Sequence, residues 1–228
     1  MIACAALFLL LPLGVVVLQG LPGLFELPQS IWAAALRSIL VAVGSAFLCA
    51  GMSLALALRG GALVAVIGVL PLAASGLVVG TGAFLIVFPF VRPADVALIV
   101  TMLANATLAL PFALRAIASA VADVQADFGR LAQSLRLTGW AWLRIVVLPR
   151  VRRPLGFGAG LAAALSMGDL GVITLFAGQA QETLPLAMYR LMGAYRMDAA
   201  AGAALVLVGL SLALFWIFDR GGRANVDM

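Results

Sequence analysis

The stretch GRLAQSLRLTGWAWLRIVVLPRVRRP, residues 129–154, holds six of the fourteen arginines in a chain of 228 residues that contains no lysine. The chain as a whole is strongly apolar, with 65% hydrophobic residues, 10% charged residues and a mean hydropathy of +1.19. Soluble domains average roughly 45–50% apolar and about 25% charged residues. The composition therefore indicates a polytopic membrane protein, with this stretch as its main polar segment.

Six apolar runs are each long enough to cross roughly 30 Å of hydrocarbon. They predict transmembrane helices at about residues 2–18, 31–58, 62–90, 94–114, 154–177 and 199–218. Pro71 lies inside the third run, where neighbouring helices can satisfy the carbonyl that a proline frees. We therefore expect an all-α membrane fold of six transmembrane helices, in a single domain over residues 1–228.

The arginines predict the orientation, because basic residues concentrate in the cytoplasmic loops of membrane proteins. With both termini in the cytoplasm, ten arginines lie inside, and Arg37, Arg92, Arg190 and Arg196 lie outside. This places the segment 119–153 in the cytoplasm and the segment 178–198 on the outer face. The net charge of +5 then reflects membrane topology rather than binding to nucleic acid.

Small residues recur along the fifth predicted helix. Gly156, Gly160 and Ala164 follow one another at four-residue spacing. In membrane helices this spacing allows two backbones to approach closely. It predicts a packed helical bundle.

The segment 119–153 has an amphipathic pattern. Asp127 is placed to cap a short helix, Thr138-Gly139 breaks that helix, and Pro149 ends a second apolar piece. We expect a helix-turn-helix that lies flat against the membrane. It is either an interfacial anchor, with its arginines on lipid phosphates, or a docking surface for a cytoplasmic partner. The apolar face of its first helix consists of Phe128, Leu131, Ala132 and Leu135.

Asp169 is the ionisable residue deepest inside a predicted span, about 22 Å along the helix that starts at Pro154. A charge there costs at least ~2.5–3.5 kcal/mol, so the side chain should face the bundle interior or a water-filled path. Gly168 and Gly171 flank it and permit local unwinding or close packing. Asp169 is therefore either a gate or translocation-path residue, suited to a cationic cargo, or a structural hydrogen-bond acceptor.

The outer segment 178–198 is expected to contain a short helix capped by Thr183. Tyr189 and Tyr195 either contact a cationic ring or sit in the aromatic belt of the membrane interface. Glu182 is a further possible outer contact. The expected apolar face of this helix consists of Leu186, Tyr189 and either Met192 or Gly193.

The missing residue types exclude several functions. The chain has no histidine, and without lysine it has no Walker A motif. Cys4 and Cys49 lie in apolar runs, where we expect small buried hydrophobes rather than zinc ligands. We expect no catalytic residue, no metal site and no cofactor bound by this chain, so any ATP–Mg would be held by another polypeptide.

The Arg-rich stretch resembles the coupling loop of ABC importer permeases, which docks into a groove on the ATPase. Where the common family pattern has glutamate, alanine, glycine and isoleucine, this chain has Arg130, Leu131, Arg136 and Val146. Ala132, Leu148 and Pro149 match the pattern. The resemblance implies an ATPase-coupling role for Arg130, Leu131, Ala132, Leu135, Arg136, Gly139, Leu148 and Pro149.

Five segments are similar to the C-terminal half of thiamine and thiamine-diphosphate ABC permeases: RLAQSLRLTGW, RRPL, LSMGDLGVITLF, TLPLAMYRLMGAYR and GGRANV. This resemblance implies a MetI-like core and a permease subunit of an ATP-driven thiamine importer in a bacterial inner membrane. The implied partners are a cytoplasmic ABC ATPase dimer, a periplasmic substrate-binding protein and a second permease half.

Three alternatives stay open at this point. The chain is either a fragment of a two-half permease or a half-size form that pairs with itself. The cargo is thiamine or one of its phosphates, or instead iron, molybdate or sulfate. The chain is either an ATP-driven permease or a carrier or channel that needs no ATPase and uses Asp169 as its ion site.

Overall fold

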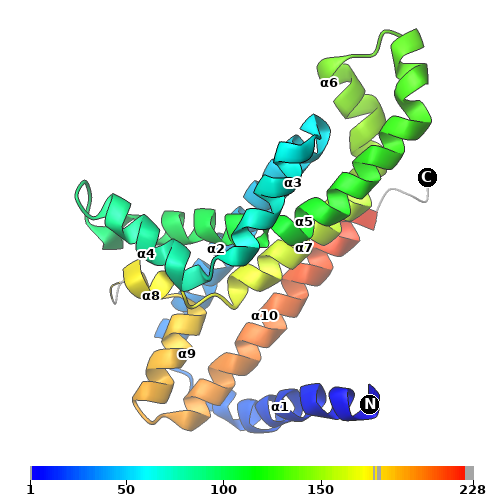
Figure 1. The fold of residues 1–228 in the computed structure, drawn as a ribbon. Coiled ribbons are helices and arrows are strands. Elements are labelled where there is room, and N and C mark those ends of the chain that lie inside the picture. Colours follow the sequence, from blue (N-terminus) through cyan, green and yellow to red (C-terminus); the bar gives the residue numbers. More distant parts are fainter. Residues whose placement is uncertain (1, 177, 179–180, 224–228) are drawn as a thin grey trace.

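The computed structural model describes residues 2–176, 178 and 181–223, and within these ranges the chain forms helices and turns but no strand. Figure 1 shows the arrangement. In chain order the elements are α1 (Ile2–Gly23), η1 (Leu24–Glu26), α2 (Ser30–Arg59), α3 (Ala62–Val69), η2 (Leu70–Ala73), α4 (Gly76–Val87), α5 (Pro93–Ser134), α6 (Gly139–Trp142), η3 (Leu143–Val147), α7 (Leu148–Met167), α8 (Ile173–Phe176), α9 (Leu184–Gly193) and α10 (Met197–Arg223).

Four helices of the described chain are long and apolar enough to cross a membrane, namely α1, α2, α5 and α10. A fifth crossing results if the bent pair formed by residues 66–73 and α4 counts as one span. The all-helical membrane class is thus confirmed. The expected count of six spans stays a prediction.

The third predicted span is broken rather than continuous. Its two parts meet at a bend of 97°, between η2 and α4. Pro71 lies in the η2 turn, and the Ser75 hydroxyl begins α4 by accepting a hydrogen bond from the Val78 N–H at 3.3 Å. A new cap directly after a proline favours two helices over one. The expectation of a single helix through Pro71 was therefore wrong.

Helix α5 is longer than predicted, because its 42 residues join the fourth predicted span to the amphipathic segment that follows. At 1.5 Å per residue it is about 63 Å long, roughly twice the thickness of the hydrocarbon layer. Asp127 lies inside this helix and does not cap a separate one. The second half of α5 and the chain that returns from it form a projecting helical hairpin (Figure 1), rather than two short helices lying flat. We use the word hairpin for segment 119–153.

The return arm of this hairpin is also continuous. The helical backbone runs from Gly139 to Met167 through Pro149 and Pro154, so the prediction that Pro149 ends a helix was wrong. The wider π-turn of η3 comes immediately before Pro149, and there the Leu148 N–H bonds to the Leu143 carbonyl. Widening the helix by one residue relieves the clash that a proline ring makes with the preceding turn.

Helix α7 differs from the fifth predicted span, residues 154–177. It ends at Met167, so only 14 residues, about 21 Å, follow Arg153 before the chain leaves the helix. Three arginines occupy its first turns, which keeps it outside the set of long apolar helices. Ala177, the expected end of the span, lies outside the described residues.

Helix α7 occupies the centre of the bundle, where it packs on α2, α5 and α10. Its contact with α10 is backbone to backbone: a Cβ on Gly156 would lie 2.6 Å from the Phe218 carbonyl oxygen, and one on Gly160 would lie 2.9 Å from that of Phe215. A Cβ on Gly222 would meet the Arg152 carbonyl at 2.8 Å. The prediction of close packing at Gly156 and Gly160 is confirmed.

Candidate functional site

The hairpin between α5 and α6 closes with a specific turn. The Leu137 N–H donates to the Ala132 carbonyl at 2.8 Å, and the Arg136 N–H donates to the Gln133 carbonyl at 3.1 Å. This pair of bonds is a Schellman motif. In this motif the residue before the last donor adopts a left-handed backbone and is usually glycine. Arg136 occupies that position with a φ of 52°. The turn thus places an arginine at the tip of the hairpin.

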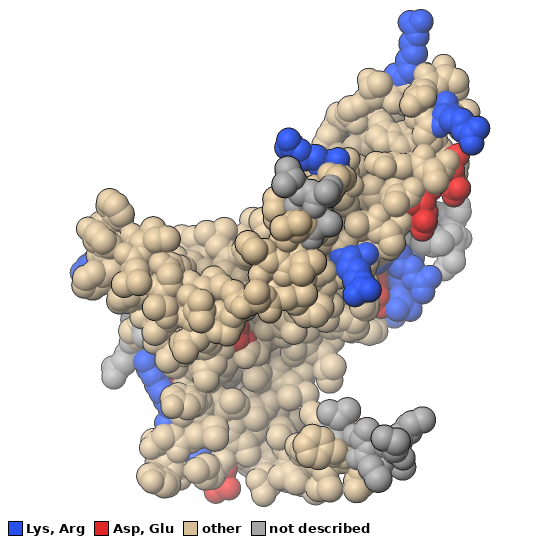
Figure 2. All heavy atoms as spheres, in the orientation of Figure 1, with Lys and Arg blue, Asp and Glu red and all other residues tan. Residues whose placement is uncertain are grey.

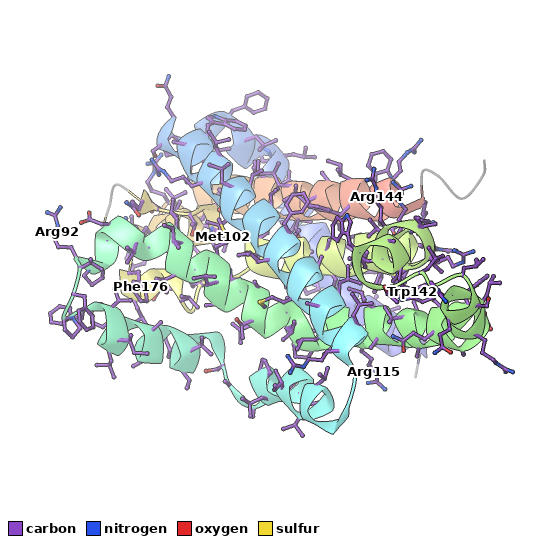
Figure 3. All side chains as sticks on the ribbon, turned by 90° about the horizontal axis from the view of Figure 1, so that it is seen from above. Arg92, Met102, Arg115, Trp142, Arg144 and Phe176 are labelled. Atoms are coloured by element: carbon purple, nitrogen blue, oxygen red, sulfur yellow. The ribbon has the colours of Figure 1, made fainter. Side chains whose placement is uncertain are left out.

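The two arms of the hairpin enclose an apolar groove of about 240 Å³. Leu131 and Leu135 on the α5 arm are 55% and 61% exposed, and Ile145 on the other arm is 59% exposed. Figure 3 shows Trp142 and Arg144 at this end of the molecule, with Arg92 and Phe176 at the opposite end. The groove is lined by Phe128, Leu131, Ala132, Leu135, Leu137, Trp142, Ile145, Val146 and Arg150.

The structure brings only some of the predicted coupling residues together. Leu131, Ala132 and Leu135 share the groove, whereas Leu148 and Pro149 lie further along the return arm and do not line it. Arg130, Arg136 and Gly139 are exposed around the tip of the hairpin. Gly139 has a φ of 57°, which a residue with a side chain rarely adopts.

A cation–π contact at the base of the groove joins the two arms, and the sequence analysis did not predict it. The Arg150 guanidinium lies 3.9 Å from the centre of the Phe128 ring. Its Nη1 also donates to the Val146 carbonyl at 3.1 Å. Nothing in the spacing of residues 128 and 150 pairs them until the hairpin is known.

A second candidate site lies around Asp169, in the turn that follows α7. The carboxylate Oδ1 accepts a hydrogen bond from the Gly171 N–H at 3.2 Å, and Oδ2 is buried without a partner. Gly168 ends α7 and is exposed. The bend before α4 brings the first turn of that helix against this carboxylate, since a Cβ on Gly76 would lie 3.2 Å from Oδ1. A helix N-terminus is a favourable neighbour for a negative charge.

Gly171 is required by the same contact. A Cβ on it would lie 3.0 Å from the Leu77 backbone nitrogen. The glycine thus serves close packing of the 168–172 turn on α4. The expected local unwinding around Asp169 is present, because the chain is not helical between α7 and α8.

Asp169 adjoins a chain of buried polar side chains that the sequence analysis missed. Asn105 on α5 donates from Nδ2 to the Ser166 hydroxyl at 2.9 Å, and Ser166 on α7 donates to the Ser45 hydroxyl at 3.2 Å. Ser45 on α2 lies within hydrogen-bonding distance of the Met102 carbonyl, at 3.0 Å. Three helices are thus joined through side chains in the bundle interior.

This polar chain leads to a small cavity. The cavity has a volume of about 10 Å³, the space of about one water molecule. It is lined by Ser38, Val41, Thr101, Ser166, Asp169, Thr183 and Pro185. Pockets for small organic ligands usually have ~300–1,000 Å³, so this polar interior is closed to such molecules in the conformation described.

Thr183 stands just before α9 but does not cap it through its side chain, whose oxygen is buried and unpartnered. The Leu184 N–H instead donates to the Ser38 hydroxyl of α2 at 2.8 Å. The buried face of α9 differs from the expected one. It consists of Leu184, Pro185, Leu186, Ala187 and Leu191, whereas Tyr189 and Met192 are exposed.

Glu182 holds the outer segment to the bundle. Its carboxylate lies 3.4 Å from Arg190 Nη1, and its carbonyl accepts a hydrogen bond from Arg37 Nη1 at 3.2 Å. Glu182 and Arg190 also line an open basin of about 470 Å³ between α9 and the start of α2. Tyr195, with a φ of 57°, is 88% exposed at the end of α9. Tyr189 is likewise exposed, and neither tyrosine lines the basin.

The relatives found by comparison with known proteins are permeases. The chain is 34% identical over 244 residues to the thiamine transport system permease protein of Salmonella typhimurium, an alignment that covers 100% of this chain and 45% of the relative. It is 35% identical over 237 residues to the protein of the same name from Brucella abortus, covering 99% and 44%. A chloroplastic sulfate permease of Chlamydomonas reinhardtii is 29% identical over 121 residues, covering 52% and 33%.

No family model matches the chain. The chain spans about half the length of the curated thiamine permeases that it matches. The similarity extends over essentially the whole chain, which carries the long apolar helices of a multi-pass membrane protein. The chain is therefore a homologue of the thiamine ABC permeases that corresponds to about one half of their length.

Proposed function

We propose that this chain is a transmembrane subunit of an ATP-driven importer, with thiamine or one of its phosphates as cargo. The observation that carries the proposal is the exposed apolar groove of the α5–α6 hairpin, in a chain homologous throughout to permeases. Exposed leucines at the tip of a projecting hairpin are typical of a surface that another protein covers. The ATPase is a separate polypeptide, since the chain has no lysine for a Walker A motif.

The membrane arrangement that we propose has six crossings. The four long apolar helices supply four, the bent pair of residues 66–73 and α4 supplies the fifth, and α7 with the turn after it supplies the sixth. The excess of arginine on the hairpin supports a cytoplasmic position for it, at the inner face of a bacterial inner membrane. Residues 178–198 then lie on the outer face.

In this arrangement, segment 119–153 is the coupling element. ATP binding closes the two ATPase subunits, which move the hairpin. Because α5 is continuous and α7 continues the return arm, both arms of the hairpin lead into the interior near Asn105 and Ser166. The hydrogen bonds between those side chains join the helices that must move relative to one another.

Asp169 supports a cationic cargo. Its Oδ2 has no hydrogen-bond partner, and none of the ion pairs among the described residues includes Asp169. An unpaired carboxylate beside a polar cavity attracts a cation such as a thiazolium and repels an anion such as sulfate. This charge favours thiamine over the sulfate carried by the more distant chloroplastic relative. Gly168 and Gly171 then form part of the gate.

The partners follow from the same proposal. A cytoplasmic ABC ATPase dimer binds the hairpin, and a periplasmic substrate-binding protein meets the outer face near Glu182, Tyr189 and Tyr195. Since the chain spans about half of its relatives, it pairs with a second permease half or with a second copy of itself.

Reconstitution tests this proposal. The chain, its cognate ATPase and the cognate binding protein are placed in proteoliposomes, and uptake of radiolabelled thiamine is measured with ATP or with a non-hydrolysable analogue. We expect uptake only with ATP, both partners and thiamine. Equal uptake without the ATPase would instead establish a carrier, and uptake of sulfate but not thiamine would overturn the assigned cargo.

A further inference from the structure

The hairpin carries a concentration of positive charge. Segment 119–153 contains six arginines but only two acidic residues, Asp123 and Asp127. Arg130, Arg136 and Arg144 are all exposed on it. Three ion pairs, which join Arg92 to Asp95, Arg190 to Glu182 and Arg223 to Asp219, include none of these three arginines. Figure 2 shows basic side chains at its tip.

These arginines surround the groove. Arg130 directly precedes Leu131, a groove residue, and Arg144 directly precedes Ile145 on the opposite arm. Arg136 stands between the arms, at the left-handed position of the turn. Arg150 differs from these three, because its guanidinium is stacked on Phe128 inside the groove.

A surface with an apolar centre and a rim of unpaired cations fits a partner of complementary pattern. Protein interfaces bury apolar anchors at their centre and keep charged groups at the rim, where complementary signs raise the association rate and select the partner. Arginine is well suited to such a rim, because its planar guanidinium binds a carboxylate in two places.

We propose that the hairpin docks on an ATPase surface with an apolar socket bordered by carboxylates, which pair with Arg130, Arg136 and Arg144. This inference rests on the proposed function and specifies the chemistry of its cytoplasmic partner. An arginine at position 130 that the partner covers needs a hydrogen-bond acceptor, and a carboxylate is the acceptor that also balances its charge. An ATPase without acids around its socket would leave these arginines buried and unpaired in the contact, which weakens its binding.

The test is binding of the cognate ATPase to the full-length chain in nanodiscs. The wild type is compared with R130E/R136E, with the groove variant L131D/L135D and with R92E as a matched control. Arg92 is suitable because its side chain is 86% exposed at the opposite end of the molecule. We expect wild-type binding to weaken as NaCl rises from ~0.05 to ~0.5 M, because surface ion pairs are screened by salt.

R130E/R136E should weaken binding about tenfold at low salt and remove most of its salt dependence. R92E should bind as the wild type does. Lysine substitutions of the acids around the ATPase socket should restore the binding of R130E/R136E, which a merely structural defect would not allow.

Other outcomes overturn the inference in distinguishable ways. If only L131D/L135D loses binding, the hairpin docks but its arginines do not select the partner. If both hairpin variants bind normally, docking at the hairpin fails, and the proposed function fails with it. If the arginine effect follows the anionic lipid content of the nanodisc and not the ATPase, the arginines serve the membrane.

Discussion

The contact between α7 and α10 offers a sharp test of the fold, because two glycines on these helices have opposite surroundings. A Cβ on Gly156 would lie 2.6 Å from the Phe218 carbonyl oxygen, whereas a Cβ on Gly209 of α10 meets nothing within 4 Å. Gly156→Ala and Gly209→Ala make the same chemical change. Only the first forces the two helices apart.

The magnitude follows from the geometry. Moving the new Cβ from 2.6 Å to an ordinary contact of 3.4 Å requires a displacement of about 0.8 Å between two packed backbones. Overpacking of this kind costs about 1–3 kcal/mol. Both variants also gain about 1 kcal/mol of helix propensity from alanine. Their free energies of unfolding should therefore differ by about 1–3 kcal/mol, with Gly156→Ala the less stable.

Thermal unfolding of the detergent-purified chain, followed by circular dichroism, measures this difference. For a protein of this size, each kcal/mol shifts Tm by about 2–4 °C. We expect Gly209→Ala to unfold at or above the wild-type temperature and Gly156→Ala to unfold below it. Equal Tm values for the two variants would refute the close α7–α10 contact.

Three further predictions concern the candidate sites. Leu131→Asp with Leu135→Asp should reduce ATP-driven uptake about tenfold or more without changing the amount of protein in the membrane, as measured in proteoliposomes and by immunoblot; unchanged uptake would exclude a coupling role. Asp169→Asn, which removes the charge and keeps the shape, should also reduce thiamine uptake about tenfold at unchanged Tm, and a fully active variant would make Asp169 structural. Arg136→Gly should raise hydrogen-exchange protection of the hairpin turn by up to ~1 kcal/mol, because it relieves a left-handed backbone, and Gly139→Ala should lower it by ~1 kcal/mol; the same sign for both would contradict the turn geometry.

Composition and spacing predicted the class of the protein and several of its contacts. An apolar chain with arginines between its spans leaves little choice but membrane helices. Gly156 and Gly160 identified a close helix contact, because small residues on one helix face are informative without knowledge of the partner. The turn between the two helical arms was predicted near its observed place, because Thr138-Gly139 is a local break signal, although α5 already ends at Ser134.

The continuity of α5 was missed for a physical reason. The fourth span was predicted to end where charges begin, at Arg115, and a new helix was predicted to begin at Asp127. A helix does not end when it leaves the hydrocarbon, however, and residues 115–134 contain no proline and only Gly129 as a weak helix former. The point where a helix leaves the hydrocarbon and the point where it ends are different residues, and composition predicts only the first.

The buried polar chain could not be predicted from the sequence. Asn105 and Ser166 are 61 residues apart, and Ser166 and Ser45 are 121 residues apart. Single serines and asparagines in apolar runs carry no periodic signal, so their pairing depends on which helix faces meet. Asp169 was identified because a charge in a predicted span is conspicuous, whereas its neighbours are uncharged.

The central claim, that the hairpin is the point where a separate ATPase acts on the membrane helices, is tested most directly by cross-linking. With Cys4 and Cys49 replaced by alanine, a cysteine is introduced at Ser134, exposed at the end of α5, or at Met192, exposed on α9. The account predicts that Ser134→Cys forms cross-links to the ATPase whose yield changes with ATP, and that Met192→Cys forms none. Cross-links from Met192→Cys alone, or none from Ser134→Cys in an assembled and active complex, would contradict it.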